Sequence, residues 1–436
     1  MRSEDRLQRD ARPGPAPARP GLAGAVGPIE TRPTVLVYRN ALLPFSETFI
    51  KEQVLACRDW RSVLIGKHEL DGLSLDGLDV RMLWPVRSYT LSRAWWKICR
   101  LFDAAPTPVV GMLRREAPLL LHVHFGVDAI DAWPLARALD VPMLVTLHGY
   151  DINTDRDWWE AGHWGRRFQR YPQRLLALAA LPQVHFVAVS QAIRRRAVAF
   201  GIPEEKISVR YIGVDSRRFV PRGRPIAERE RRVLFAGRLV EKKGCEHLVR
   251  AMATVQASVP DARLVIAGDG PLKGDLQRLA ETLRVRADFR GALSSEEVQG
   301  ELALARALCL PSVTAANGDA EGFGLVLLEA QASGVPVVTS AQGGREEGVR
   351  EGVTGFTFAE RDNDMLAFHL MRILTDDNIS TSMAAAGPRF VADSFDLAQC
   401  TEALEMLYDV ITQRLSPVRS KTPANVARAH ADAASS

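Results

Sequence analysis

The stretch PSVTAANGDAEGFGLVLLEA, residues 311–330, decides the fold. A short apolar run at residues 307–310 precedes it, and its second half is apolar enough to continue as a helix from about Phe323. Between the two lies a loop of small and polar residues. The stretch therefore predicts a strand, a loop and a helix, which is the repeating unit of a parallel α/β sheet.

Two acids and two glycines in this stretch suggest a ligand site. Gly322 and Gly324 allow a ligand to approach the backbone, and the first N–H groups of a helix attract anions. We expect Glu321 in the loop and Glu329 about two turns into the helix. The alternative for Glu321 alone is a structural role, because acidic residues are favoured at helix N-termini.

The same alternation of apolar runs and amphipathic segments extends over most of the chain. Nearly continuous runs of Val, Ile, Leu and Ala are typical of parallel strands that are covered on both faces. We therefore expect an α/β fold with doubly wound sheets. The predicted strands are residues 35–38, 63–65, 119–125, 143–147, 185–189, 207–211, 232–236, 263–267, 307–310 and 336–339, with helices between them such as 246–259 and 274–283.

The strand series restarts near residue 231, after a polar stretch rich in Arg and Pro, and 436 residues suit two domains. Ligands of open α/β sheets bind beyond the carboxyl ends of the strands. Two Rossmann-like domains that face each other would thus form a central cleft. We predict a disordered tail at 1–30, domains at 31–215 and 216–395, a C-terminal helix at 396–415 and a second disordered tail at 416–436.

Composition excludes several classes of protein. The chain has 47% hydrophobic and 25% charged residues, as in soluble globular proteins, and no apolar stretch long enough to cross a membrane. Five scattered cysteines without CxxC spacing indicate the reduced thiols of a cytoplasmic protein and argue against a zinc site. No nucleic-acid-binding motif is present.

Basic residues outnumber acidic ones between residues 31 and 215, whereas the two balance between 216 and 395. The basic first half suits an anionic surface such as a phospholipid leaflet or a lipid pyrophosphate. A solvated basic surface is the alternative. The segment 93–102 interleaves Trp with Arg and Lys, which favours either a membrane interface or a helix that buries its Trp residues.

Cations follow the first strand of the second half, in the stretch FAGRLVEKKG at 235–244. Arg238 and Lys243 suit a diphosphate, since Arg binds phosphate oxygens in pairs and Lys supplies a point charge. Lys242 is interpreted as a solvated neighbour. Gly237 belongs to the same loop, and Gly268 in the turn AGDGP at 267–271 is expected to shape a neighbouring loop.

The first half of the chain offers fewer residues that suggest a functional site. His148 ends a predicted strand in TLHGYD, and His122 and His124 lie two apart on another, so both point to one face. That spacing suits a metal, but no third ligand is evident, and we expect no metal site. Ser46 and Glu47 belong to a short segment that is able to cap the next helix.

The stretch EGFGLVLLEA, with seven residues between its acids, resembles the E-x7-E signature of glycosyltransferase family 4. QASGVPVVT (331–339), GGREE (343–347) and GVTGF (352–356) resemble that family too, and the resemblance covers most of 35–410. The family commonly reads GGIPE where this chain has Arg345 and Glu346, while Glu347 matches. Residues 43–50, HVHFG and HGYD resemble transferases of bacterial exopolysaccharide assembly, such as those of the colanic acid and amylovoran pathways.

This resemblance implies a GT-B fold and transfer of a hexose, with retention of configuration, from a UDP- or GDP-sugar to a glycan. It implies a lipid-linked oligosaccharide acceptor, contact with the cytoplasmic face of the inner membrane, and no metal or cofactor. The implied catalytic residues are His148, Glu321, Arg238 and Lys243. The implied donor site is Gly237, Arg238, Lys243, Gly268, Glu321, Gly322, Phe323, Gly324, Leu325 and Glu329, and the implied acceptor site is Ser46, Glu47 and His124.

Two other classes of function fit the same architecture. A nucleotide-sugar epimerase or a glycan phosphorylase shares GT-B, although a phosphorylase needs a pyridoxal lysine that no motif marks here. A non-catalytic partner that binds sugar nucleotides or lipids is the second alternative. The set Glu321, Glu329, Arg238 and Lys243 favours an enzyme over such a partner.

Overall fold

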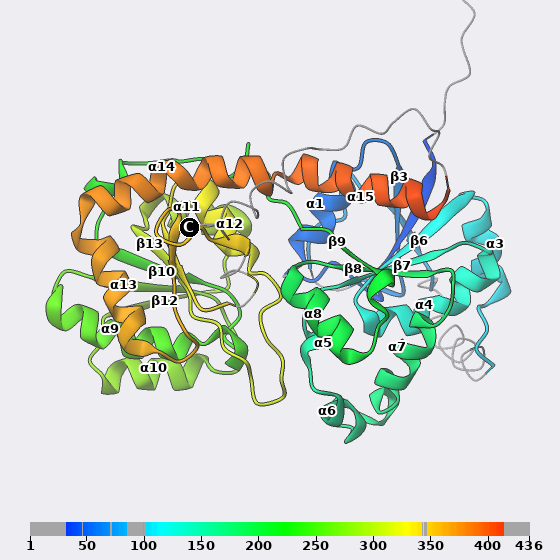
Figure 1. The fold of residues 1–436 in the computed structure, drawn as a ribbon, viewed down its shortest axis with the longest axis horizontal. Helices are drawn as coiled ribbons and strands as arrows, with labels where there is room; N and C mark the ends of the chain where they lie inside the picture. Colours follow the sequence, from blue (N-terminus) through cyan, green and yellow to red (C-terminus); the bar gives the residue numbers. More distant parts are fainter. Residues whose placement is uncertain are drawn as a thin grey trace, which may run out of the picture. The chain divides into compact units, whose positions relative to one another are not determined.

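The computed structural model describes residues 32–45, 47–69, 72–84, 99, 102–341, 343 and 347–413. Residues 33–436 form one compact unit, and the features below belong to it (Figure 1). Both predicted tails lie outside the described residues. Ser46 and nearly all of the segment 93–102 lie outside them as well.

The first half of the chain forms a parallel sheet in the order β5-β3-β1-β6-β7-β8-β9, and β2 pairs with β4 beside it. The order reverses between β1 and β6, which makes their carboxyl ends the topological switch point. The strands are β1 (Thr34–Tyr38), β2 (Ala41–Leu42), β3 (Arg61–Gly66), β4 (His68–Glu69), β5 (Asp79–Met82), β6 (Pro118–His124), β7 (Met143–Leu147), β8 (Val184–Ala188) and β9 (Ile207–Val209). The helices are α1 (Thr48–Ala56), α3 (Thr107–Arg114), α4 (Gly126–Leu139), α5 (Tyr150–Asn153), α6 (Arg156–Glu160), η2 (Arg166–Phe168), α7 (Tyr171–Ala179), α8 (Gln191–Phe200) and η3 (Glu204–Lys206).

The second half forms a parallel sheet in the order β12-β11-β10-β13-β14-β15, with its switch point between β10 and β13. Its strands are β10 (Arg232–Ala236), β11 (Arg263–Ala267), β12 (Ala287–Gly291), β13 (Ala307–Leu310), β14 (Val337–Thr339) and β15 (Gly355–Thr357). Its helices are η4 (Ile226–Glu228), η5 (Glu241–Lys243), α9 (Cys245–Ser258), α10 (Lys273–Thr282), α11 (Ser295–Leu304), α12 (Leu325–Ala332), α13 (Asn363–Thr375) and α14 (Asp377–Ser394). The predicted α/β class with two doubly wound sheets is confirmed.

The helix in the second half of the deciding stretch begins later than the sequence predicts. We expected it to start at about Phe323, but α12 starts at Leu325. Gly324 precedes it with φ of 86°, a left-handed conformation that interrupts the helix and that glycine adopts most easily. Glu329 is therefore the fifth residue of α12, little more than one turn from its start, and not two turns as expected.

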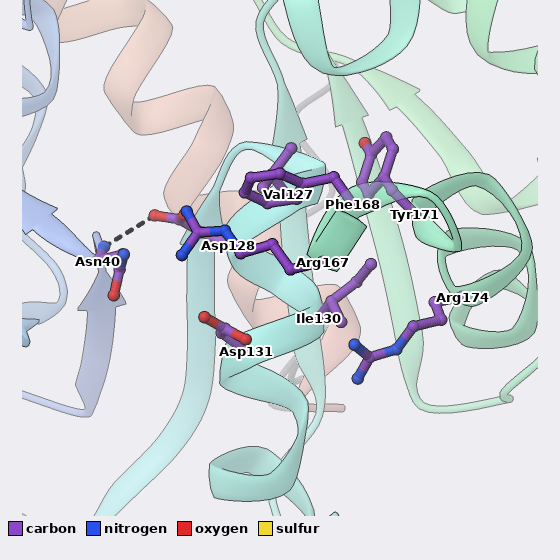
Figure 2. Close-up of a pocket in the computed structure, with 9 residues that line it drawn as sticks. All are labelled: Asn40, Val127, Asp128, Ile130, Asp131, Arg167, Phe168, Tyr171 and Arg174. Atoms are coloured by element: carbon purple, nitrogen blue, oxygen red, sulfur yellow. Dashed lines mark hydrogen bonds between the residues drawn. The ribbon is translucent and has the colours of Figure 1, made fainter. Parts of the chain in front are cut away.

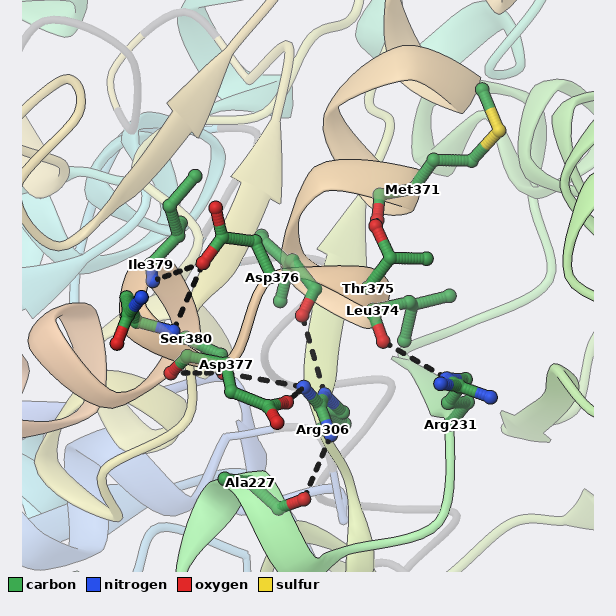
Figure 3. A network of polar contacts seen from close by, with 12 residues as sticks. Ala227, Arg231, Arg306, Met371, Leu374, Thr375, Asp376, Asp377, Ile379 and Ser380 are labelled. Carbon is green, nitrogen blue, oxygen red and sulfur yellow. Dashed lines mark hydrogen bonds and ion pairs between the residues drawn. The ribbon is translucent and has the colours of Figure 1, made fainter.

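A buried arginine fastens the start of the second half to its last helices. Arg306 is 3% exposed and forms an ion pair with Asp377 at the start of α14 (Figure 3). It also donates hydrogen bonds to the carbonyls of Ala227, at 3.0 Å, and Ile373, at 3.2 Å. Because Arg306 directly precedes β13, these bonds tie η4, α13 and α14 to the strand that leads into the deciding stretch.

The last described helix, α15 (Leu397–Ile411), packs against the first sheet. Leu404, Leu407 and Tyr408 share a buried cluster with residues of β1 and β3. The carboxylate of Glu405 accepts hydrogen bonds at 2.9–3.0 Å from the backbone N–H groups of residues 58–60. The C-terminal part of the chain thus completes the N-terminal fold.

The chain crosses between its two halves at two places that touch each other. The backbone N–H of Val214 donates to the carbonyl of Phe395 at 2.9 Å, and Leu397 N–H donates to the carbonyl of Val214 at 3.0 Å. A Cβ on Gly213 would lie 2.4 Å from the Cα of Leu397. The two crossings are therefore hydrogen-bonded side by side. In the described part of the chain, no helix is long and apolar enough to cross a membrane.

Candidate active site

Two ion pairs connect the loops that follow β10 and β13, at the switch point of the second sheet. Lys243, at the end of η5, pairs with Glu321, and the two side chains are only 16% and 13% exposed. Lys242 pairs with Asp319 at 3.0 Å. The sequence prediction that Lys242 is a solvated neighbour is wrong, because this partner is supplied by the other loop.

The two carboxylates respond differently to similar burial. Burial opposes ionisation of Glu321, but Lys243, Lys242 and Arg238 outweigh it and lower the pKa of this carboxyl. Burial raises the pKa of Asp319, and the attraction of Lys242 only partly offsets that rise. Glu321 is therefore the more firmly ionised acid of the loop.

Arg238 is exposed next to this cluster, and its guanidinium has no hydrogen bond or ion pair with the residues that the structure describes. It nevertheless lies close enough to lower the pKa of Glu321. A cation that is near the cluster and has no carboxylate partner is able to bind an incoming anion. Arginine suits phosphate because it binds phosphate oxygens in pairs, and phosphate binding by Arg238 stays a prediction.

Glycines allow the loops to meet closely. A Cβ on Gly268 would lie 1.9 Å from the carbonyl oxygen of Gly237, whose own N–H donates to the carbonyl of Ala267 at 3.0 Å. A Cβ on Gly322 would lie 2.1 Å from the carbonyl oxygen of His148. The sequence suggested that Gly322 admits a ligand. In the structure its neighbour is the backbone of His148 in the first half, so its lack of a side chain allows the contact between the two halves.

Phe323 and Leu325, both predicted donor-site residues, direct their side chains into packing contacts. Phe323 is 5% exposed, and its ring centroid lies 5.7 Å from that of Tyr211 and 5.4 Å from that of Phe395. Leu325 is partly buried against the hydrophobic cores of both halves. Both side chains therefore stabilise the packing around the loop, and their contact with a donor stays a prediction.

Glu329 is a half-buried acid without a hydrogen-bond partner among the described residues. Burial, reinforced by the nearby carboxylate of Glu52, raises its pKa to about 7, against the attraction of Arg218. Arg218 itself is paired with Glu52 at 2.8 Å. The carboxyl of Glu329 is therefore free to accept hydrogen bonds from a ligand.

His148 stands at the end of β7, on the first half of the chain. Its Nε2 lies 2.9 Å from Nδ1 of His124, and its ring packs on Phe49 and Phe125 with centroids 5.0 and 4.5 Å away. Burial keeps the pKa of His148 well below its ordinary value, so the imidazole is neutral. Its loop is fixed because the Asp151 carboxylate accepts from three backbone N–H groups, those of Gly126, His148 and Gly149.

His124, a predicted acceptor-site residue, lies inside the first half. It is 1% exposed, and its Nε2 has no hydrogen-bond partner among the described residues. Beside it, His122 is held between the Tyr408 hydroxyl and the Thr146 hydroxyl, each at 2.7 Å. His124 is therefore placed to orient His148, and its contact with an acceptor stays a prediction.

Glu47, the second predicted acceptor-site residue, is 6% exposed and binds Arg39 through both oxygens, at 2.7 and 2.8 Å. Arg39 also binds Asp128 at 2.6 Å and lies over the Phe125 ring. Glu47 is therefore engaged by Arg39 within the fold, and its contact with an acceptor stays a prediction. Sequence reasoning missed Arg39 and Asp128, although each follows one of the two switch-point strands.

The loop of the deciding stretch is hydrogen-bonded to the first half. Ser190 Oγ donates to the Gly322 carbonyl at 2.8 Å, and Asn153 Nδ2 donates to the Ala320 carbonyl at 3.0 Å.

Glu347, in the later loop GGREE, also bonds the first half. It accepts from the Gln191 N–H at 2.9 Å and from the Tyr211 hydroxyl at 2.6 Å. Residues 344–346, with the unusual Arg345 and Glu346, lie outside the described residues.

A pocket opens at the switch point of the first sheet (Figure 2). It lies between the end of β1, the start of α4, and the segment formed by η2 and α7. Among the described residues, no three His, Cys, Asp or Glu side chains form a group that could hold a metal ion. The pocket is lined by Asn40, Val127, Asp128, Ile130, Asp131, Arg167, Phe168, Tyr171 and Arg174.

Two protein-family models match the chain. The model described as "Glycosyl transferases group 1" matches residues 216–390, which contain the second sheet and both ion pairs. The model described as "Glycosyltransferase Family 4" matches residues 70–218, which contain His124 and His148.

Individual proteins are similar over different spans. A GDP-mannose-dependent alpha-(1-6)-phosphatidylinositol monomannoside mannosyltransferase of Mycobacterium tuberculosis is 36% identical over 47% of this chain, and the chain spans only 56% of that protein. A putative colanic acid biosynthesis glycosyltransferase of Salmonella typhimurium is 30% identical over 66% of this chain and 70% of that protein. A crystal structure of Anabaena HepE in complex with UDP-glucose has a TM-score of 0.68 at 19% identity, over 86% of this chain and 99% of that one.

Proposed function

The chain belongs to glycosyltransferase family 4 and has the GT-B fold, and from this premise we propose that it transfers a hexose from a nucleotide-sugar to a glycan with retention of configuration. One observation carries the proposal. At the switch point of the second sheet, the ionised Glu321 is paired with Lys243, and the unpaired Arg238 stands beside them. This arrangement suits a diphosphate whose outer phosphate releases a sugar.

The leaving group is the nucleoside diphosphate. When the bond from the sugar to the outer phosphate breaks, negative charge grows on the phosphate oxygen, and Arg238 and Lys243 stabilise it. Glu321, held ionised by its cationic neighbours, accepts hydrogen bonds from hydroxyls of the donor sugar. Glu329 accepts hydrogen bonds from the ribose with a carboxyl that has no described partner.

The sugar keeps its anomeric configuration if the acceptor attacks the same face of the sugar from which the diphosphate departs. No sequence motif places a nucleophile, so we propose a front-face displacement. The acceptor hydroxyl forms the new glycosidic bond, and its proton passes to the departing phosphate oxygen. The neutral His148, oriented by His124, lies against a donor hydroxyl across the contact between the two halves.

We propose a lipid-linked glycan of cell-surface or exopolysaccharide synthesis as acceptor, reached at the cytoplasmic face of the inner membrane. Two relatives support this: one acts on a phosphatidylinositol mannoside, and the other is assigned to colanic acid biosynthesis. The UDP-glucose bound in the Anabaena structure and the GDP-mannose of the mycobacterial enzyme support a UDP- or GDP-sugar donor. Leaving-group stabilisation by cations supports a reaction that needs no metal or cofactor.

The first experiment identifies the donor and the stereochemistry. UDP-glucose, UDP-galactose and GDP-mannose are screened by thermal shift, and the best donor is incubated with a polyprenyl-pyrophosphate-linked glycan. NMR of the product should show the anomeric configuration of the donor, and activity should persist in EDTA. Inverted product, or activity that returns only with added metal, would contradict the mechanism.

The second experiment tests the cationic cluster. Lys243→Ala should lower kcat by about 10²–10³-fold, because it removes one charge that stabilises the leaving group. Arg250→Ala is the matched control, since Arg250 is exposed on α9 and has no described partner. Full activity of Lys243→Ala in a folded protein would exclude the proposed role.

A further inference from the structure

The pocket of the first sheet (Figure 2) lies where an open α/β sheet binds its ligands. Asn40 follows β1, and Val127 and Asp128 belong to the first turn of α4, directly after β6. None of the donor-site residues lines it. The pocket is therefore a separate candidate site on the half of the chain that is expected to hold the acceptor.

The charge of the pocket is not balanced. Its two carboxylates already have cationic partners from outside the lining: Asp128 is bound by Arg39 at 2.6 Å, and Asp131 faces Lys67 at 3.5 Å. Its two guanidinium groups, those of Arg167 and Arg174, form no ion pair with any described residue. Arg39 also binds Glu47. Three carboxylates (Glu47, Asp128 and Asp131) therefore stand against four cations (Arg39, Lys67, Arg167 and Arg174), which leaves one net positive charge around the pocket.

Asn40 provides a second, independent observation. Its Oδ1 is buried and has no hydrogen-bond partner among the described residues, while its backbone N–H donates to Asp128 at 2.8 Å. Leaving a buried acceptor unpaired costs about 1–3 kcal/mol. This oxygen is covered, so a ligand hydroxyl would bond it once the Asn40 amide turns into the pocket that it lines.

The size of the pocket limits what enters it. Its volume is about 50 Å³, several times the ~10–15 Å³ that one ordered water needs. This suits one compact group such as a phosphate, with the remainder of the molecule at the mouth. Guanidinium groups match phosphate oxygens well because they donate two parallel hydrogen bonds. In Figure 2, Arg174 and Asn40 stand at opposite sides of the pocket.

We propose that this pocket binds the phosphate group of a phosphorylated sugar, and that it is the site that recognises the acceptor. Arg167 and Arg174 bind the phosphate, and Asn40 accepts a hydrogen bond from an adjacent sugar hydroxyl. The proposal rests on the proposed function in assigning this ligand to the acceptor. The phosphate belongs either to a free sugar phosphate or to the carrier of a lipid-linked sugar.

Binding is tested on the full chain by calorimetric titration with glucose 1-phosphate, with UDP present at saturation to fill the donor site. Glucose 1-phosphate should bind, and the double variant Arg167→Gln/Arg174→Gln should weaken it at least tenfold. Arg250→Gln is the matched control and should bind it like the parent. Equal affinity of the double variant and the parent would overturn the proposal.

Three comparisons separate this proposal from its alternatives. UDP affinity should be the same in the double variant and the parent, which shows that the donor site is intact and the fold preserved. Lys243→Ala should bind glucose 1-phosphate normally. Glucuronate should bind at least tenfold more weakly than glucose 1-phosphate, and equal binding would make the ligand an acidic sugar and refute the phosphate assignment.

The source of the phosphate is identified by transfer assays. If the carrier supplies it, the double variant raises KM for the polyprenyl-pyrophosphate-linked acceptor at least tenfold. If a free sugar phosphate supplies it, glucose 1-phosphate itself is glycosylated, and the double variant raises its KM. A double variant that binds glucose 1-phosphate normally but no longer sediments with phosphatidylglycerol vesicles would show that these arginines serve a membrane surface, and would overturn the proposal.

Discussion

Glu321 and Glu329 belong to the same short stretch of sequence and nevertheless ionise very differently. Three cations surround Glu321 and lower its pKa despite burial. Glu329 is half-buried near another carboxylate, that of Glu52, and its pKa is raised to about 7. Their neighbours come from other elements, so the chemistry of each acid is set by the fold.

The raised pKa of Glu329 predicts a pH-dependent stability. Below its ordinary value of 4.5 the carboxyl is protonated in both the folded and the unfolded chain. Between 4.5 and about 7 the unfolded chain releases this proton while the folded chain keeps it, so the group reduces stability as pH rises. Glu329→Gln should therefore melt like the parent at pH 4 and higher than it at pH 8, by on the order of 5 °C.

Thermal unfolding of both proteins across this pH range measures the effect. A difference in Tm that is the same at pH 4 and pH 8 would contradict it. Glu321→Gln should show the opposite sign, because a lowered pKa contributes stability that is present above the unfolded value and lost as pH falls.

The close approach of Gly322 to the backbone of His148 predicts the effect of adding a side chain at this position. Gly322→Ala places a methyl group 2.1 Å from the His148 carbonyl, and because that atom is backbone, the loop must shift. We expect a lower Tm and at least a tenfold loss of donor affinity, measured by thermal unfolding and calorimetry. The matched control is Gly300→Ala in α11, where no atom lies within 4 Å, and which should stabilise the protein by about 1 kcal/mol.

At the scale of elements, α15 is distant in sequence from the sheet it completes. Tyr408 bonds His122, which is 286 residues away, and Glu405 binds the loop before β3. His122 packs on His124 with ring centroids 4.6 Å apart, and His124 bonds His148. The last helix is therefore linked through three histidines to the candidate site.

Tyr408→Phe removes one hydroxyl from this element. It leaves a buried nitrogen of His122 without its partner, so we expect a loss of about 1–3 kcal/mol in the free energy of unfolding. Denaturant unfolding measures it. The control is Met406→Ala on the exposed face of the same helix, with an expected change within about 0.5 kcal/mol. Equal effects of the two variants would show that the hydrogen bond contributes nothing.

The sequence predicts the central strands better than the edges. Buried strands such as β1 and β10 have continuous apolar runs, and their predicted bounds differ by at most one residue. β12 and β15 were not predicted: β12 alternates between half-buried and exposed residues, and β15 has three residues. An edge strand is covered less, so its sequence carries a weaker apolar signal.

The residues of the candidate site also differ in how well the sequence predicts their positions. Arg238, Lys243, Glu321 and Glu329 are predictable because short strands place them at one edge of a sheet. The burial of Glu47 and His124 was not predictable. It depends on Arg39 and Asp128, 89 residues apart, and on the packing of α15 against the first sheet.

For the whole molecule, the position of α15 predicts that the two halves stay together when the chain is cut. Residues 221–225 are exposed between the halves, so a protease site is inserted after Gly223. The fragments should co-elute in size-exclusion chromatography, because the second fragment carries the helix that completes the core of the first. In a chain that ends before Leu397, the cut fragments should separate. Separation with α15 present would refute the prediction.

The two neighbouring crossings at Val214 and Phe395 have a mechanical consequence. Two bodies that are joined at two neighbouring points rotate most easily about the line through those points. Here backbone hydrogen bonds join the two crossings, and the close approach of Gly213 to Leu397 leaves no room for them to slide past each other. We therefore expect any movement of one half against the other to be a rotation about the line through these two crossings. Such a rotation would bring the loops of the second sheet to His148 in one relative position.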